Sequence, residues 1–168
     1  MSAILSPCGE YRYRLERDLG LFGPVGAFIM VNPSTADASL DDQTIRKVKG
    51  FAIRLGWTRV IVGIVFAFRA TDISQLARAH DPVGPKNLEY LHRILDDAEC
   101  VVCAWGALQK LPIGLRDQWS LVPDMATSLG KSLQCLGTVK DGHPKHPLLV
   151  SYSSPVVGWS APSGSTAS

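Results

Sequence analysis

The feature that most constrains the fold is an uninterrupted apolar run over residues 25–31, which stops at Asn32-Pro33. A strand that is apolar on both faces is typical of a parallel sheet covered by helices on each side. The run has to end in a turn, because the proline has no backbone N–H to donate to a neighbouring strand. Segments that are mainly apolar, over residues 59–68, 99–104 and 132–136, predict further strands.

Amphipathic helices are expected between these strands. Asp42 can cap a helix that carries one apolar face, and Pro85 suits the first turn of a second helix. Shorter helical segments are expected over residues 106–111 and 124–129. The alternation predicts an α/β fold, a three-layer α/β/α domain whose mainly parallel central sheet has about four or five strands. The alternating pattern over residues 10–17 predicts a half-exposed strand at the edge of that sheet.

The length of 168 residues suits one domain, which we place at residues 1–150. Residues 151–168 are rich in Ser, Pro, Gly and Ala and are expected to form a flexible tail. The chain contains no run of roughly eighteen apolar residues, and its start lacks a basic segment followed by a long apolar one. We therefore expect a cytoplasmic protein with no membrane span. The sequence does not indicate an oligomeric state.

The net charge is only +2, but the charges are distributed unevenly. No acidic residue occurs between Gln43 and Thr71, whereas Arg46, Arg69 and four other basic residues do. This local positive charge suits a partner that carries phosphate, such as a nucleic acid or a nucleotide. A solvated helix face explains the same pattern equally well, and the sequence does not separate the two.

Cys100 and Cys103 have the spacing of a redox pair or of half a zinc site. They lie in an apolar run predicted to be a strand, where residues three apart point to opposite faces. No second cysteine pair and no nearby histidine pair completes a metal set. We expect buried core thiols, no metal and no cofactor.

The candidate site is the polar loop that follows the first buried run. Asn32, Ser34 and Thr35 supply hydrogen-bond donors and acceptors, and Asp37 is a candidate general base. Because the loop leads to a helix that begins near Asp42, backbone N–H groups there favour an anion or an electron-rich edge. A turn followed by a helix cap explains the same residue types without any function.

Asn32, Arg69 and Trp105 each follow or close a predicted strand at one edge of the sheet, where ligands gather in such folds. Arg69 either meets a phosphate or carboxylate there or forms a structural ion pair. Further along the chain, His143 and His146 are each followed by a proline and could act as acid and base or bind a metal. We favour a rigid loop that presents one imidazole to a ligand, because a catalytic zinc needs a third protein ligand.

Six short motifs occur in order along residues 11–149. They are Met30-Val31-Asn32-Pro33-Ser34-Thr35-Ala36-Asp37, Asp41-Asp42-Gln43-Thr44-Ile45-Arg46, Phe66-Ala67-Phe68-Arg69-Ala70-Thr71-Asp72, Pro82-Val83-Gly84 with Asn87, Ala104-Trp105-Gly106, and Asp141-Gly142-His143-Pro144-Lys145-His146-Pro147-Leu148. Together they resemble a family of small bacterial and phage proteins, the domain of unknown function sixteen-forty-three. The family implies no established reaction.

The same segments are similar, more distantly, to the uracil-DNA glycosylase superfamily. Val31-Asn32-Pro33-Ser34 resembles its first loop, Trp105-Gly106 resembles its turn into a helix, and His143-Pro144 or His146-Pro147 resembles its final loop. This resemblance implies a uracil-DNA glycosylase-like fold in which Asn32 positions the attacking water. A histidine of the last loop would hydrogen-bond the oxygen of the leaving base, and Leu148 or Leu149 would enter the stack as the base flips out.

We therefore predict recognition of a nucleobase or nucleotide, with hydrolytic base excision of the DNA glycosylase type. The candidate catalytic residues are Asn32, Asp37, His143 and His146, and the candidate substrate-binding residues are Pro33, Ser34, Thr35, Asp42, Arg46, Arg69, Trp105 and Lys145. One alternative is an enzyme that acts on free nucleotides or nucleotide-linked small molecules. The other is a non-catalytic nucleic-acid-binding module with the same pocket, so whether the protein is an enzyme stays open.

Overall fold

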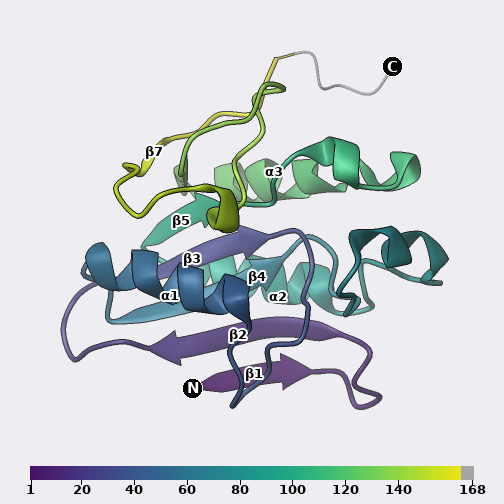
Figure 1. The fold of residues 1–168 in the computed structure, drawn as a ribbon, viewed down its shortest axis with the longest axis horizontal. Helices are drawn as coiled ribbons and strands as arrows, with labels where there is room; N and C mark the ends of the chain where they lie inside the picture. The colour runs from purple at the N-terminus through teal and green to yellow at the C-terminus, as the bar shows by residue number, and fades with distance from the viewer. Residues whose placement is uncertain (164–168) are drawn as a thin grey trace.

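The centre of the sheet is parallel, as the buried apolar runs predict. β3 (Val25–Met30) lies between β4 (Arg59–Ile64) and β5 (Cys100–Cys103), and β6 (Leu133–Cys135) pairs with β5. The computed structural model describes residues 1–163 and shows β3, β4 and β5 side by side in the middle of the domain (Figure 1). β3 and β4 are paired up to their last residues, so they end at the same edge of the sheet.

Antiparallel strands extend the sheet on both sides and make it mixed rather than mainly parallel. β2 (Arg12–Asp18) pairs with β4, β1 (Ser2–Leu5) covers β2, and β7 (Val157–Gly158) pairs with β6. The seven strands lie in the order β1-β2-β4-β3-β5-β6-β7, so β2 is not the edge strand that its alternating pattern indicates. The sequence does not reveal β1 or β7, because strands of 4 and 2 residues are too short for a clear apolar pattern.

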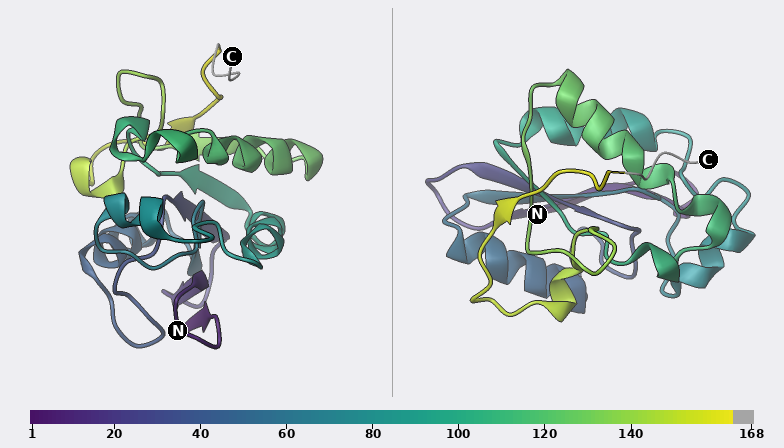
Figure 2. Two further views of the ribbon diagram at one scale, coloured as in Figure 1. Left: turned by 90° about the vertical axis from the view of Figure 1, so that its right-hand side faces the viewer. Right: turned by 90° about the horizontal axis from the view of Figure 1, so that it is seen from above.

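Helices cover both faces of the sheet. α1 (Gln43–Arg54) lies on one face, and α2 (Asn87–Asp97) and α3 (Leu121–Ser128) lie on the other (Figure 2). Alternate residues along the strands belong to two separate core clusters, one on each face of the sheet. Phe28 packs with the apolar face of α1, and Ile29 packs with the apolar faces of α2 and α3. The α/β class predicted from the sequence is confirmed.

Local signals place the ends of these helices. Oδ1 of Asp42 accepts the N–H of Ile45 at 2.9 Å and caps α1, as predicted. The helix expected over residues 106–111 is reduced to one 3-10 turn, η2 (Leu108–Lys110), and the last helix begins at Leu121, before the expected start. Further 3-10 turns are η1 (Ile73–Arg78), η3 (Ile113–Leu115), η4 (Gln118–Ser120) and η5 (Pro147–Leu149). No helix in the described residues is long and apolar enough to cross a membrane.

Residues 151–163 pack against the domain, although the sequence predicts a flexible tail from residue 151. The ring of Tyr152 lies 4.9 Å from that of Phe51 on α1. Trp159 is 7% exposed, and its Nε1 donates to the carbonyl of Gly142 at 3.0 Å. These two aromatic side chains bury enough apolar area to anchor a Ser- and Pro-rich stretch. The rest of the predicted tail, residues 164–168, lies outside the described residues.

Candidate functional site

A cavity of about 530 Å³ lies beyond the carboxyl ends of β3 and β5. Asn32 follows β3 and Trp105 follows β5 into this cavity, which we call the main cavity. The other lining residues come from the end of β3 and from three loops: Val31, Thr71, Asp72, Ile73, Gly106, Ala107, Lys110, Val139, His146, Leu148 and Leu149. A mostly apolar wall with a few polar groups is typical of a small-molecule site.

Two backbone carbonyls fix the amide of Asn32. Its Nδ2 donates to the carbonyl of Pro33 at 3.0 Å and to that of Ala70 at 2.8 Å. The reversed amide would set Oδ1 against two acceptors, so the orientation is determined by the network. Oδ1 accepts no hydrogen bond from residues 1–163, and it is the atom left to meet a ligand or a water.

His146 is the histidine of the last loop that lines the main cavity. Its Nδ1 accepts the backbone N–H of Leu148 at 3.2 Å, so the neutral ring carries its proton on Nε2. Burial lowers the pKa of His146 and nearby Lys110 lowers it further, whereas Asp42 acts in the opposite direction. The site therefore favours a neutral imidazole that can donate one hydrogen bond.

His143 lies behind Trp105 rather than in the main cavity. Nε1 of Trp105 donates to Nδ1 of His143 at 3.3 Å, and the His143 ring meets the Trp119 ring edge-on at 4.5 Å. His143 is 3% exposed, and burial lowers its pKa, opposed by Asp141. Next to Trp105, Gly106 has a φ of +83°, and its N–H donates to the carbonyl of Pro144 at 2.9 Å. His143 thus positions the indole that forms one wall.

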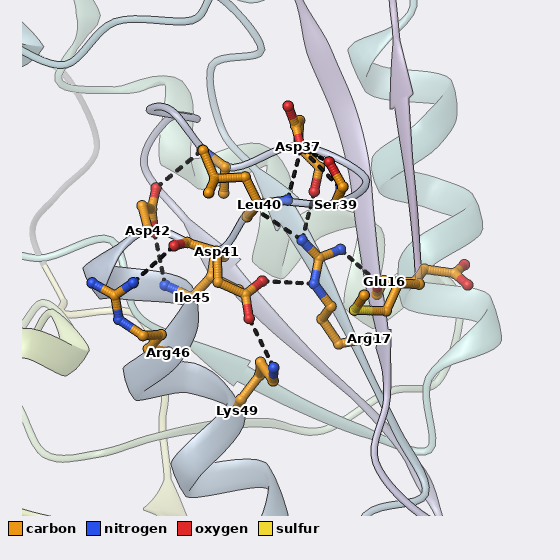
Figure 3. Close-up of polar contacts among 12 residues, drawn as sticks. Glu16, Arg17, Asp37, Ser39, Leu40, Asp41, Asp42, Ile45, Arg46 and Lys49 are labelled. Atoms are coloured by element: carbon orange, nitrogen blue, oxygen red, sulfur yellow. Dashed lines mark hydrogen bonds and ion pairs between the residues drawn. The ribbon is translucent and has the colours of Figure 1, made fainter.

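A buried arginine holds the loop of residues 32–42, which we call the site loop (Figure 3). Arg17 on β2 is fully buried; its Nε donates to Oδ1 of Asp41 at 2.7 Å, and its Nη2 donates to the carbonyls of Asp37 at 2.5 Å and Leu40 at 3.3 Å. Nζ of Lys49 reaches the other oxygen of Asp41 at 2.7 Å. Partial burial alone would raise the pKa of Asp41, but the hydrogen bonds from Lys49 and Arg17 outweigh it and lower that pKa.

A smaller pocket of about 190 Å³ adjoins the main cavity. It shares Val31, Asn32, Thr71, His146 and Leu148 with the main cavity. Its own walls include Arg12, Ser34, Asp42 and Thr44, and we call it the Arg12 pocket. Two predicted substrate-binding residues, Ser34 and Asp42, therefore lie beside the main cavity rather than in it.

Several predicted site residues line neither of these two spaces. Oδ1 of Asp37 accepts the N–H groups of Ser39 at 2.9 Å and Leu40 at 2.8 Å, which lower its pKa and make it a turn residue. Arg69 and Thr35 line a separate open depression, and Nη1 of Arg69 donates to the carbonyl of Gly9 at 3.3 Å.

The other three of these residues serve the backbone or the surface. Pro33 is buried, and its carbonyl accepts the N–H of Ala70 at 3.0 Å. Arg46 is exposed and donates to the carbonyl of Asp41 at 3.0 Å. Lys145 lies along Gly137, whose carbonyl accepts its backbone N–H at 2.9 Å.

The basic stretch after Gln43 does not form one free positive surface. Lys49 pairs with Asp41, and Arg59 pairs with Asp18 at 2.8 Å. Lys47 and Arg54 lie over the ring of Tyr152, at 4.2 and 3.8 Å from its centre.

The two cysteines of the spaced pair belong to opposite core clusters, as their spacing predicts. Burial raises the pKa of Cys103 strongly, so its thiol stays protonated. Among residues 1–163, no group of three His, Cys, Asp or Glu side chains is placed to hold a metal ion.

Sequence reasoning misses Arg12, Thr71, Asp72 and Lys110 as site residues. Thr71 and Asp72 directly follow Arg69 in one of the six motifs, which is a usable signal. Arg12 gives no such signal, because it sits in a pattern of alternating charged and apolar residues that resembles an exposed strand.

Comparison with known proteins gives one match. No curated protein and no solved structure matches the chain. The model of a family described as protein of unknown function, DUF1643, matches residues 12–148, from the start of β2 to Leu148 in η5. This match spans Arg12, the site loop, Trp105 and His146. The chain therefore belongs to the DUF1643 family.

Proposed function

We propose that the main cavity binds a nucleobase and that the protein hydrolyses the N-glycosidic bond that joins this base to DNA. The observation that carries this proposal is the placement of Asn32, with its amide fixed, and neutral His146 in one cavity. The volume of about 530 Å³ falls within the range of ligand pockets, roughly 300–1,000 Å³.

The residues of the cavity suit the two ends of the reaction. Oδ1 of Asn32 accepts a hydrogen bond from a water, which orients a lone pair of that water toward the sugar C1′. The water forms the new bond to C1′ as the base leaves with the electrons of the broken C–N bond. Nε2–H of His146 donates to an oxygen of the base as negative charge develops there. The water's proton passes to solvent or to the base.

The apolar groups of the cavity suit a base removed from its stack. The buried indole of Trp105 and the side chains of Val31 and Ile73 supply apolar wall. Leu148 and Leu149 line the same cavity and are 40% and 68% exposed, so they are available to fill the gap left by a flipped base. Helices on both faces of a sheet with a parallel centre support the three-layer, uracil-DNA glycosylase-like architecture that the resemblance implies.

A second candidate function is an enzyme that acts on free nucleotides. The observation that favours it is the polar Arg12 pocket beside the main cavity, which offers room for a second part of a small ligand. Product formation from mononucleotides, but not from oligonucleotides, would select this candidate.

The test is incubation with oligonucleotides that carry a panel of modified bases, and with the matching mononucleotides, followed by detection of abasic sites and free base. Asn32→Ala should lower turnover about a hundredfold or more. It also leaves the carbonyl of Ala70 without a donor, whereas the carbonyl of Pro33 keeps the N–H of Ala70, so a stability loss of about 1–3 kcal/mol is expected. Asp37→Ala is the matched control, because it removes a turn in the same loop but no cavity group; its turnover should stay near wild type. Equal loss in both variants, or binding of a base without any product, would contradict the catalytic proposal.

A further inference from the structure

Arg12 is a buried cation with most of its hydrogen-bonding capacity unused. It is 3% exposed, and Nη1 donates to the carbonyl of Ala36 at 2.8 Å. Nε is buried and has no partner, and among the described residues no carboxylate lies within ion-pair distance of the guanidinium, although Asp42 and Asp37 favour its charge from further away. A guanidinium carries five N–H donors, and leaving a buried charge unpaired is costly. Nη1 makes one hydrogen bond, so the Nη end of the guanidinium has N–H donors left for an acceptor in the pocket that Arg12 lines.

The space in front of Arg12 has the size and polarity for such an acceptor. The Arg12 pocket has a volume of about 190 Å³, several times the roughly 30 Å³ that one water occupies in the liquid. Ser34 and Thr44 bring hydroxyl groups to its wall. Thr44 lies in the first turn of α1, where backbone N–H groups favour an anion.

Asp42 is the acidic residue of this pocket and has to be reconciled with an anion. Its Oδ1 already accepts the N–H of Ile45 at 2.9 Å, and its Oδ2 accepts that of Ala36 at 3.4 Å. These bonds turn the carboxylate toward the backbone and leave the guanidinium of Arg12 outside ion-pair distance. The pocket thus offers the donors of Arg12 and of the two hydroxyl groups, beside one carboxylate whose oxygens are already hydrogen-bonded. This set suits a single anionic group better than a polyphosphate.

We propose that the Arg12 pocket is a binding site for one phosphate group. The planar fork of arginine matches the geometry of phosphate oxygens. Because the pocket shares Asn32 and His146 with the main cavity, a nucleotide can place its base in the main cavity and its phosphate against Arg12. This last step rests on the proposed function; the phosphate site itself does not. The phosphate is either the monoester of a free nucleotide or a diester of a nucleic-acid backbone.

The test compares the affinity of a nucleoside, its 5′-monophosphate and a dinucleoside monophosphate, measured by calorimetry. In the wild-type protein a phosphorylated ligand should bind about ten- to a hundredfold more tightly than the nucleoside, as charge-assisted hydrogen bonds predict. Arg12→Met should remove this preference, so that the nucleoside and the phosphorylated ligands bind with similar affinity. Arg69→Met is the matched control, because Arg69 lines a separate depression; it should keep the preference.

The arms of the experiment separate the possible outcomes. A preference for the monoester indicates a free nucleotide, and a preference for the diester indicates a nucleic-acid backbone; both support the site. If the nucleoside does not bind at all, the proposed function fails, and inorganic phosphate is then the probe: an Arg12-dependent rise in melting temperature supports the site. If Arg12→Met does not fold, Arg12→Lys, which keeps the charge and loses the fork, should weaken the preference. A preference that is absent in the wild type, or unchanged in the folded Arg12 variant, overturns the proposal.

Discussion

Replacing Arg17 by leucine tests whether one buried guanidinium holds the site loop. The side chain is fully buried, and the substitution removes its hydrogen bonds to Asp41 and to the carbonyls of Asp37 and Leu40, of which the Leu40 carbonyl keeps the N–H of Asp37. Removing one partner of a buried ion pair costs about 3–5 kcal/mol. Lys49 still reaches Asp41, whose side chain is 18% exposed, so we expect the lower end, about 3 kcal/mol. For a domain of this size that corresponds to a fall in melting temperature of roughly 6–12 °C.

Lys49→Met is the matched control, because Lys49 binds the same carboxylate from a side chain that is 30% exposed. A partly exposed pair of this kind contributes about 1 kcal/mol or less. Urea unfolding, followed by tryptophan fluorescence, gives both free energies, and limited proteolysis reports whether cleavage within residues 32–42 becomes faster. An Arg17 variant that loses no more stability than the Lys49 variant, with no new cleavage in the loop, would refute the anchoring role.

Two further predictions concern the wall of the main cavity. Burial holds the pKa of His146 below its unfolded value of about 6.5, so below that pH the folded protein binds fewer protons than the unfolded chain. The corresponding stability is present above about pH 6.5 and is lost as the pH falls from there through the folded pKa. Burial of His143 acts in the same direction. Urea unfolding at pH 7.5 and 5.5 should therefore show that the free energy of unfolding falls on acidification, and that it falls less in His146→Asn than in the wild type. A fall in His146→Asn as large as that of the wild type would be inconsistent with the burial argument. Gly106→Ala should lower the free energy of unfolding by about 1–2 kcal/mol because φ is +83°, whereas Gly114→Ala, at an open position, should change it by less; equal effects would contradict the reasoning.

The parallel centre of the fold could be predicted because its strands are buried on both faces. Residues 25–31 and 60–68 contain no charged or polar side chain, and such runs have few other places in a small domain. The antiparallel additions could not be predicted in the same way. β2 carries Arg12 and Arg17, which are buried although their residue type indicates exposure. The two arginines are buried because they contact the site loop, and the local residue pattern of β2 does not indicate these contacts.

Site residues that directly follow a buried strand could be predicted from the sequence. Site residues that a loop brings to the cavity from another part of the chain could not. Asn32 and Trp105 follow β3 and β5, so the topology of a parallel sheet brings them to one edge. Arg69 fails this reasoning because β4 ends at Ile64, and by Arg69 the chain is hydrogen-bonded to residues 10–12 at the start of β2 rather than to β3. The choice between His143 and His146 depends on the indole of Trp105, which occupies Nδ1 of His143 and leaves His146 for the cavity.

The contacts of β2 explain why a strand outside the parallel centre matters to the site. Arg12 donates to the carbonyl of Ala36, and Arg17 donates to the carbonyls of Asp37 and Leu40. Two side chains of β2 therefore hold the backbone of the site loop. The two arginines differ in how many of their N–H donors are left without an acceptor. Arg17 also forms an ion pair with Asp41, whereas Arg12 forms none among the described residues and is favoured only by the more distant charges of Asp42 and Asp37. A guanidinium needed only to hold the loop is expected to be satisfied as Arg17 is, and the incomplete hydrogen bonding of Arg12 supports the proposal that its pocket receives a phosphate.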